Sequence, residues 1–152
     1  MTTIALASDH AGFKLKEAIK SYLAVKGYNL RDFGPVNDES CDYPDFGHPA
    51  ANDVETGDAD LAITMCGTGN GMQMTLNKHQ KIRAALCWLP EIAALARKHN
   101  DANILVLPAR FISESEAIKI VDAFLETDFE GGRHLRRIKK IPLNIDVEGE
   151  IM

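Results

Sequence analysis

Short apolar runs alternate with amphipathic segments along almost the whole chain, and no other feature restricts the possible folds as strongly. The apolar runs predict buried strands, and they span residues 3–7, 28–33, 61–65, 82–87 and 104–107. Strands that alternate with helices imply right-handed crossovers and a parallel sheet that is covered on both faces. We therefore predict a single α/β domain over residues 1–152, with a three-layer, Rossmann-like fold and a five-stranded parallel sheet.

The helical segments between these strands carry their own start and stop signals. Gly27 ends the first helix, and Ser113 with Glu116 forms a capping box before the most regular apolar face in the chain. Residues 35–49 are rich in Asp, Asn, Ser and Pro and predict a surface loop. The remaining helices are expected over residues 15–23, 49–55, a short stretch ending near 77, 90–98 and about 133–141, followed by a tail at 143–152.

Composition narrows the classes of protein that the chain can represent. Its net charge of −5 makes nucleic acid a poor default partner, although residues 133–140 form one basic cluster. The N-terminus lacks the basic region of a signal peptide, and no apolar run approaches the ~20 residues of a membrane helix. The three cysteines form no CxxC pair, which is typical of reduced thiols in the cytoplasm. We expect a cytoplasmic protein without a metal or a cofactor.

A glycine-rich segment, Cys66-Gly67-Thr68-Gly69-Asn70-Gly71, directly follows the third predicted strand. In open parallel sheets, ligands bind beyond the carboxyl ends of the strands, where this segment lies. It is neither a Walker loop nor a dinucleotide fingerprint, because no Gly-Lys-Ser/Thr follows and Met72 replaces the last glycine. One interpretation is a simple glycine-rich connection. The other is a thiolate beside converging amides, which is suited to proton transfer with oxyanion stabilisation.

Three further groups admit both a structural and a functional interpretation. Asp9-His10 is either a helix cap with a surface histidine or part of the same sheet-edge site, and His99-Asn100 is either an ordinary helix C-terminus or catalytic. Arg133 and Arg137 lie four residues apart on one helix face. They belong either to a solvated surface or to a site for a phosphate dianion.

Taken together, seven motifs resemble the B-type ribose-5-phosphate isomerases in order and spacing, over residues 3 to 142. These motifs are Asp9-His10-Ala11-Gly12, Asp42-Tyr43-Pro44, residues 66–71, Asn77-Lys78, Ile82-Arg83-Ala84, His99-Asn100-Asp101 and Gly131-Gly132-Arg133-His134. One branch of this family carries a glutamate base shortly after the glycine loop. Met72 cannot accept a proton, so the chain resembles the cysteine branch.

The resemblance implies isomerisation of ribose 5-phosphate to ribulose 5-phosphate through a cis-enediolate, in the non-oxidative pentose phosphate pathway. Cys66 would be the base, and the loop Gly67, Thr68, Gly69, Asn70 and Gly71 would bind the developing anion. The remaining implied roles are ring opening by Asp9 and His99, with Thr68 nearby as a further catalytic residue, sugar binding by Tyr43 and Asn100, and phosphate binding by His10, Arg110, Arg133 and Arg137.

The resemblance also implies a homodimer, or a tetramer, with active sites shared between subunits. Two alternatives are an isomerase of allose 6-phosphate or galactose 6-phosphate and, outside the enzymes, a nucleotide-binding stress-type module. The second lacks its expected Gly-x2-Gly-x9-Gly-Ser/Thr loop in this sequence.

Overall fold

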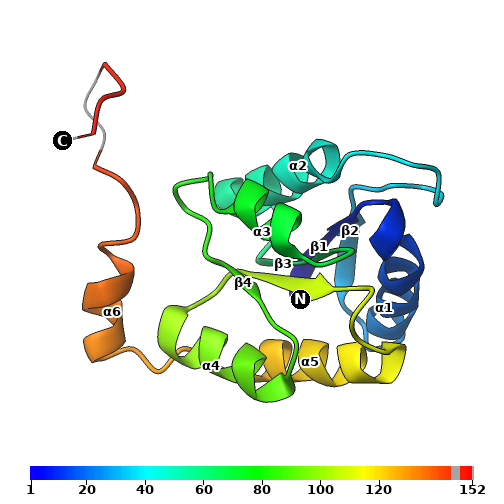
Figure 1. Cartoon of the computed structure of the whole chain (residues 1–152). Coiled ribbons are helices and arrows are strands. Elements are labelled where there is room, and N and C mark those ends of the chain that lie inside the picture. The colour runs from blue at the N-terminus through cyan, green and yellow to red at the C-terminus, as the bar shows by residue number, and fades with distance from the viewer. Residues whose placement is uncertain (145–147, 152) are drawn as a thin grey trace.

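The predicted parallel sheet is confirmed by a computed structural model that describes residues 1–144 and 148–151. Its five strands are all parallel and lie in the order β2-β1-β3-β5-β4 (Figure 1). They comprise β1 (Thr3–Ser8), β2 (Asn29–Asp32), β3 (Leu61–Cys66), β4 (Ala84–Leu86) and β5 (Ile104–Pro108). Each strand falls within or close to a run that the sequence predicts.

The helices cover both faces of this sheet, as the three-layer prediction requires (Figure 1). They are α1 (Phe13–Val25), preceded by a 3-10 turn η1 (His10–Gly12), α2 (Tyr43–Thr56), α3 (Asn70–Leu76), α4 (Pro90–Asn100), α5 (Glu114–Glu126) and α6 (Arg133–Ile138). The capping box of Ser113 and Glu116 starts α5 as predicted. Helix α5 ends at Glu126, ahead of the glycine pair Gly131-Gly132.

Alternating side chains on the strands divide the core into two layers of different character. On β1, Ile4 and Leu6 point to the face that is covered by α1, α4 and α5, whereas Ala5 and Ala7 point to α2 and α3. The first face is filled by large aliphatic residues and Phe124. The second is lined by alanines, so that α2 packs close to the sheet on the side that carries the glycine loop.

The predicted loop over residues 35–49 is partly wrong, because α2 already begins at Tyr43. Asp42 occupies the N-cap position and Pro44 lies in the first turn, where its missing N–H costs nothing. Pro49 lies inside the helix rather than at its start. Burial of Gly47 and Ala50 against the neighbouring core stabilises this helix in spite of its prolines and outweighs local propensity.

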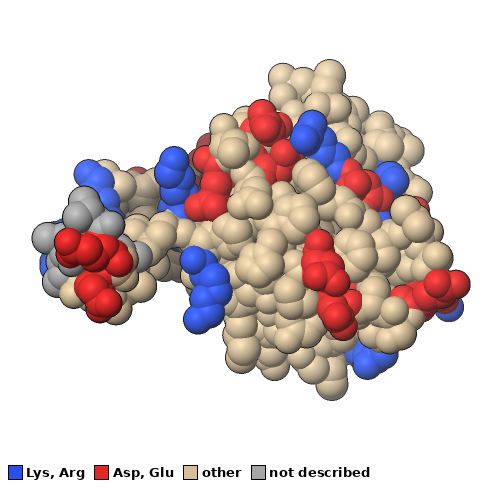
Figure 2. Space-filling model, turned by 90° about the horizontal axis from the view of Figure 1, so that it is seen from above, with Lys and Arg blue, Asp and Glu red and all other residues tan. Residues whose placement is uncertain are grey.

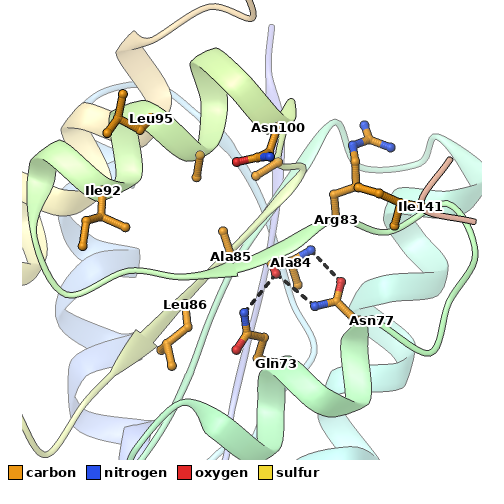
Figure 3. A pocket seen from close by; sticks show the side chains of 12 residues that line it. Gln73, Asn77, Arg83, Ala84, Ala85, Leu86, Ile92, Leu95, Asn100 and Ile141 are labelled. Carbon is orange, nitrogen blue, oxygen red and sulfur yellow. Dashed lines mark hydrogen bonds between the residues drawn. The ribbon is translucent and has the colours of Figure 1, made fainter. Parts of the chain in front are cut away.

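Strand β4 is shorter than predicted and forms one edge of the sheet. Its outer side at Ala84 is paired by side chains rather than by another strand. Asn77 accepts a hydrogen bond from the Ala84 N–H at 2.9 Å, and the amides of Asn77 and Gln73 donate to the Ala84 carbonyl at 3.0 and 3.3 Å (Figure 3). The edge strand is thereby closed at this residue.

The C-terminal segment, from the start of α6 at Arg133 to residue 144, forms an arm beside the body of the molecule (Figure 1). Helix α6 packs against α4 and ends at Ile138, three residues earlier than predicted, since the chain tightens there into turns from Arg137 to Lys140 and from Ile138 to Ile141. The Leu143 N–H donates to Gln80 Oε1 at 2.9 Å and ties the arm back to the body. The predicted tail at 143–152 lies partly outside the described residues.

Among the described residues, no helix is both long and apolar enough to cross a membrane. On the face shown in Figure 2, acidic side chains are interspersed with Lys and Arg over the body.

Candidate active site

The strand order places a topological switch point between β1 and β3. The chain leaves β1 toward β2 on one side, and β3 lies on the other side, so the connections diverge at their carboxyl ends. Parallel sheets of this kind bind ligands in the resulting crevice. Asp9 follows β1 and Cys66 ends β3, so both candidates lie at this point.

Cys66 lies at the base of the glycine loop and is almost buried, with 4% of its surface exposed. Its carbonyl accepts a hydrogen bond from the Ala109 N–H, and the Gly67 carbonyl accepts one from the Arg110 N–H, both at 3.0 Å. A side chain at Gly67 would stand 3.4 Å from the Arg110 guanidinium. The end of β5 therefore fixes the loop and brings Arg110 against it.

Two glycines of the loop, Gly69 and Gly71, lie so close to neighbouring groups that a side chain at either position would be crowded. Gly69 has φ of +79° and caps α3, a conformation that favours glycine, and a Cβ there would lie 3.4 Å from the Leu107 carbonyl oxygen. At Gly71 a Cβ would lie 2.8 Å from the Tyr43 hydroxyl, so the phenol ring rests directly on the loop. Tyr43, which the sequence analysis placed in a loop, reaches this position from the first turn of α2.

The local contacts of Asp9 and His10 fit both interpretations of this pair, the helix cap with a surface histidine and the sheet-edge site. The Asp9 carboxylate caps η1 by accepting from the Gly12 N–H at 3.1 Å, and it is 7% exposed. His10 Nδ1 lies 3.2 Å from both the nitrogen and the carbonyl oxygen of Cys41. These contacts hold the segment before α2 over the same crevice.

The three free thiols occupy different environments. Burial raises the pKa of Cys87 to about 12, so this thiol stays protonated at any physiological pH. The pKa of Cys41 is also raised, chiefly by burial and also by the neighbouring Asp9 carboxylate. Cys66 differs from both because it adjoins the glycine loop, where the first amides of a helix lack partners within the helix and suit an anion. This arrangement fits a base beside an oxyanion site.

A second group of candidates lies between the C-terminal end of α4 and the arm, away from Cys66. His99, Asn100, Arg133 and Arg137 line one cavity of about 410 Å³ together with residues of α6. The sequence-based prediction that Arg133 and Arg137 share one face is therefore confirmed. Two guanidinium groups facing one cavity suit a phosphate group.

The C-terminal end of α4 holds His99 and Asn100 in place. Asp101 follows with φ of +45°, a left-handed conformation that Asp tolerates better than most residues. Arg97 binds the Asp101 carboxylate at 3.0 Å, and Arg83 Nε donates to the Asp101 carbonyl at 2.9 Å. These two arginines, which the sequence interpretation did not assign, fix the turn that carries the candidate catalytic histidine.

Glu130 and His134 are also absent from the sequence-based set of site residues. The His134 ring stacks on His99 with centroids 4.4 Å apart and an angle of 15° between the planes. Burial, His99 and Arg133 lower the pKa of His134. The only sequence signal for this residue was its place in the Gly-Gly-Arg-His motif, which by itself assigns no contact.

The structure does not bring the two groups together within one chain. Helix α4 runs antiparallel to the strands, so its C-terminal end lies beside the amino ends of the strands. At this end of the sheet, the Asn103 carbonyl accepts a hydrogen bond from the Ala62 N–H. Cys66 pairs with Pro108 at the opposite edge, four residues along β3 from Ala62, or about 13 Å of strand. Within one chain, the two groups of candidate residues therefore lie at opposite ends of the strands.

The comparisons with known proteins agree with this fold. The family described as Ribose/Galactose Isomerase matches residues 4–141. A probable ribose-5-phosphate isomerase B of Mycoplasma genitalium is 50% identical over 140 residues, covering 91% of this chain and 92% of the relative. None of the motifs that carried the resemblance lies outside the matched range.

Two solved structures extend the similarity to three dimensions. A ribose 5-phosphate isomerase of Thermotoga maritima superposes with a TM-score of 0.92 at 52% identity, covering 93% of this chain and 97% of that one. Ribose-5-phosphate isomerase B of Mycoplasma genitalium with bound ribulose-5-phosphate gives a TM-score of 0.88 at 49% identity, with coverage of 92% and 93%. With the family match over nearly the whole sequence, the chain belongs to the ribose/galactose isomerase family and is an isomerase.

Proposed function

We propose that the protein interconverts ribose 5-phosphate and ribulose 5-phosphate, with Cys66 as the catalytic base. The observation that carries this proposal is the position of Cys66 at the switch point, under the glycine loop and beside Arg110. The relative with bound ribulose-5-phosphate supports the substrate class. We place the reaction in the cytoplasm and in the non-oxidative pentose phosphate pathway.

The proton transfer follows from this arrangement. The Cys66 thiolate removes the proton from C2 of the open-chain aldose, the C–H electron pair forms the C1–C2 double bond, and the carbonyl electrons move to O1. In the resulting cis-enediolate, the O2 proton is transferred to O1. The O2 electrons then re-form a carbonyl at C2, while the electron pair of the C1–C2 double bond takes the proton back from the Cys66 thiol at C1, and the ketose is released.

The glycine loop stabilises the charge that develops during this step. Backbone amides of Gly67 to Gly71 bind the enediolate oxygens, and Thr68, which is exposed at the mouth of the crevice, lies within the same loop. Donors that are fixed before the reaction are worth several kcal/mol at such a position, on the order of the ~3 kcal/mol measured for oxyanion holes. Gly69 and Gly71 permit the loop conformation and the contact with Tyr43.

The remaining roles divide between the two groups of candidate residues, the one around Cys66 and the one between α4 and the arm, which are the two half-sites of this proposal. Asp9 assists ring opening from the Cys66 side and His99 from the arm side, and Tyr43 and Asn100 bind the sugar hydroxyls. The phosphate lies between His10 with Arg110 and the pair Arg133 and Arg137. A phosphate dianion held by four basic side chains suits charge-assisted bidentate binding.

This division supports a homodimer in which the arm of one subunit completes the site of the other. A groove of about 450 Å³ beside β4 is lined by Leu86, Ile92, Leu95 and Ile141, among other residues (Figure 3). Leu95 is 40% exposed and contributes to the apolar lining of this groove. A second copy of the chain that covers this groove would bury the apolar surface and place its own Arg133 and Arg137 near Cys66.

Substitution of Cys66 tests the assignment directly. Cys66→Ala should lower kcat by at least about a hundredfold, the loss expected for a general base, while the thermal unfolding temperature stays close to that of the wild type. Cys41→Ala is the matched control and should keep near wild-type activity. Activity of Cys66→Ala within about threefold of the wild type contradicts the proposal. Assays with ribose 5-phosphate, allose 6-phosphate and galactose 6-phosphate identify the preferred sugar.

A further inference from the structure

Three side chains with metal-binding atoms converge where the arm meets the end of α4. His99 at the end of α4, Glu130 in the connection after α5, and His134 in α6 each present one ligand atom, and all these atoms lie within 4.8 Å of one another. Among the described residues, no other group of three or more His, Cys, Asp or Glu side chains was found at such a spacing. Glu130 and His134 are four residues apart, but no pattern in the sequence indicates that the fold returns them to His99.

One of these atoms has no partner although it is buried. His134 is 6% exposed, and its Nε2 lacks a hydrogen-bond partner within the described structure. Glu130 Oε1 lies 3.9 Å away, which is too far for a hydrogen bond and leaves the ring nitrogen unsatisfied. A buried imidazole nitrogen without a partner is costly, and a ligand that it can bind removes this cost.

A small cation fits between these ligands once two side chains turn. Zn²⁺ binds histidine nitrogen at about 2.0–2.1 Å, so two tetrahedral ligands lie about 3.3–3.4 Å apart. The Glu130 side chain is 51% exposed and can rotate to shorten the 3.9 Å gap to His134. The His99 and His134 rings are stacked with 15° between their planes, so their in-plane lone pairs meet at one ion only after the half-buried His99 ring turns out of the stack. Both rings line the same cavity of about 410 Å³, which leaves space for this rotation and for a water molecule as fourth ligand.

We propose that His99, Glu130 and His134 form a binding site for Zn²⁺ or a similar divalent transition-metal ion. Two histidines and one carboxylate are a common ligand set for an exchangeable zinc ion. Arg133 and Arg137 line the same cavity, and their positive charges oppose the cation, so the ion is held weakly enough to be removed by a chelator. The ion is not needed for the isomerase reaction.

Occupation of this site has a consequence for the proposed activity. A metal ion bound to the His99 imidazole takes up the lone pair that ring opening requires. Zinc is therefore expected to inhibit turnover of the cyclic substrate, and chelation to restore it. The inhibition depends on the function proposed above, whereas the binding site does not.

Calorimetric titration of the full-length protein with ZnCl₂ in phosphate-free buffer tests the site without an activity measurement. The wild type should bind one ion per chain. Glu130→Gln should weaken binding about tenfold or more, since even the loss of a residue behind a ligand costs that much. Asp128→Asn, which removes an exposed acidic group on the same segment, is the matched control and should leave the affinity unchanged.

Two other places where zinc can bind are distinguished by their own variants. His48 Nδ1 lies 2.8 Å from His79 Nε2, and Cys66 offers a thiol, so His48→Ala and Cys66→Ala are titrated in parallel. Unchanged affinity in Glu130→Gln, or a loss of binding only in His48→Ala or Cys66→Ala, would overturn the proposal. Because Glu130 is exposed and its variant should fold normally, the result is decisive even if a buried His134→Gln substitution destabilises the chain.

The same variants separate the binding site from its effect on catalysis. Inhibition of ribose 5-phosphate turnover should follow the binding curve of the wild type and require about tenfold more zinc in Glu130→Gln, with basal activity unchanged. Zinc binding that depends on Glu130 without any inhibition would leave the site standing and contradict the ring-opening role of His99.

Discussion

The phenol ring of Tyr43 lies against the backbone of Gly71, so closely that a Cβ at position 71 would stand 2.7 Å from Tyr43 Cε1 and 2.8 Å from its hydroxyl oxygen. The first turn of α2 and the glycine loop after β3 are thus in direct contact across the crevice. Tyr43 is 37% exposed, so its ring can move outward if the space is taken.

This contact makes Gly71→Ala a test of the sugar-binding role of Tyr43. The added methyl group should displace the ring and raise KM for ribose 5-phosphate several-fold, about 1 kcal/mol for the loss of one hydrogen bond. The unfolding temperature should change little, because an exposed side chain can give way. In a Tyr43→Ala background, Gly71→Ala should have no further effect on KM. Additive effects in the double variant would show that the loop itself, not Tyr43, is disturbed.

The paired arginines on α6 predict a selective loss of phosphate binding. Arg133→Ala or Arg137→Ala each removes a charge-assisted hydrogen bond, worth about 1.5–3 kcal/mol, or roughly 10- to 150-fold in kcat/KM. The loss should appear mainly in KM, because the phosphate is remote from the reacting carbons. Arg136 is exposed and does not line the cavity, so Arg136→Ala is the matched control. Equal effects of all three substitutions would indicate a general charge effect instead.

The separation of the two half-sites predicts complementation between subunits. Cys66→Ala and Arg137→Ala chains should each be impaired alone, whereas a mixture after subunit exchange should regain activity, with up to one intact site per heterodimer. The measurement is kcat/KM before and after exchange, with exchange verified by mass. No recovery would mean that each chain builds its site alone, and the isomerase assignment would survive that result.

A buried ion pair at the end of β2 predicts a pH-dependent contribution to stability. Lys16 is fully buried and binds the Asp32 carboxylate at 2.8 Å. Burial opposes the charge of Asp32, but hydrogen bonds from Lys16 and Lys20 outweigh it and lower the pKa of the carboxyl group. The stabilisation is therefore present above the unfolded-state pKa of about 4 and is lost as the pH falls through the lower folded-state value.

Asp32→Asn should accordingly reduce the free energy of unfolding at pH 7 by roughly 3 kcal/mol, since it leaves a buried charge with a single partner, Glu17. Lys20→Ala removes only a half-exposed cation and should cost less than about 1 kcal/mol. Urea unfolding at several pH values measures both. The difference between Asp32→Asn and the wild type should shrink below about pH 4. A difference that persists unchanged at low pH would contradict the sign of this pKa shift.

Much of the fold could be predicted because its signals are local. Each strand is a short apolar run, and the crossovers of α/β chains have one hand, so the sheet and its layers follow. The start of α2 could not be predicted from the same rules. Gly47 and Pro49 are individually unfavourable inside a helix, and only packing of this segment against the alanine-lined face of the sheet overrides them.

The candidate site was predictable to the extent that topology alone determines it. Cys66, Asp9 and Arg110 follow parallel strands and must meet at one edge. The contact of His134 with His99 depends on how α6 returns to α4, which is set by the turn at Gly131 and Gly132 and by the Glu130 N–H that donates to the Lys98 carbonyl at 3.0 Å. No periodicity in the sequence encodes that return path.

The side-chain amide of Asn77 imitates a neighbouring strand at Ala84, since it offers both an acceptor and a donor to the same residue. An incoming chain therefore finds this position of the β4 edge already occupied and cannot extend the sheet there by main-chain pairing. Association along this edge must proceed through side chains in the adjoining groove, which allows a finite assembly and disfavours open-ended stacking of sheets. One polar residue thus helps to decide whether copies of the chain assemble into a defined complex or aggregate.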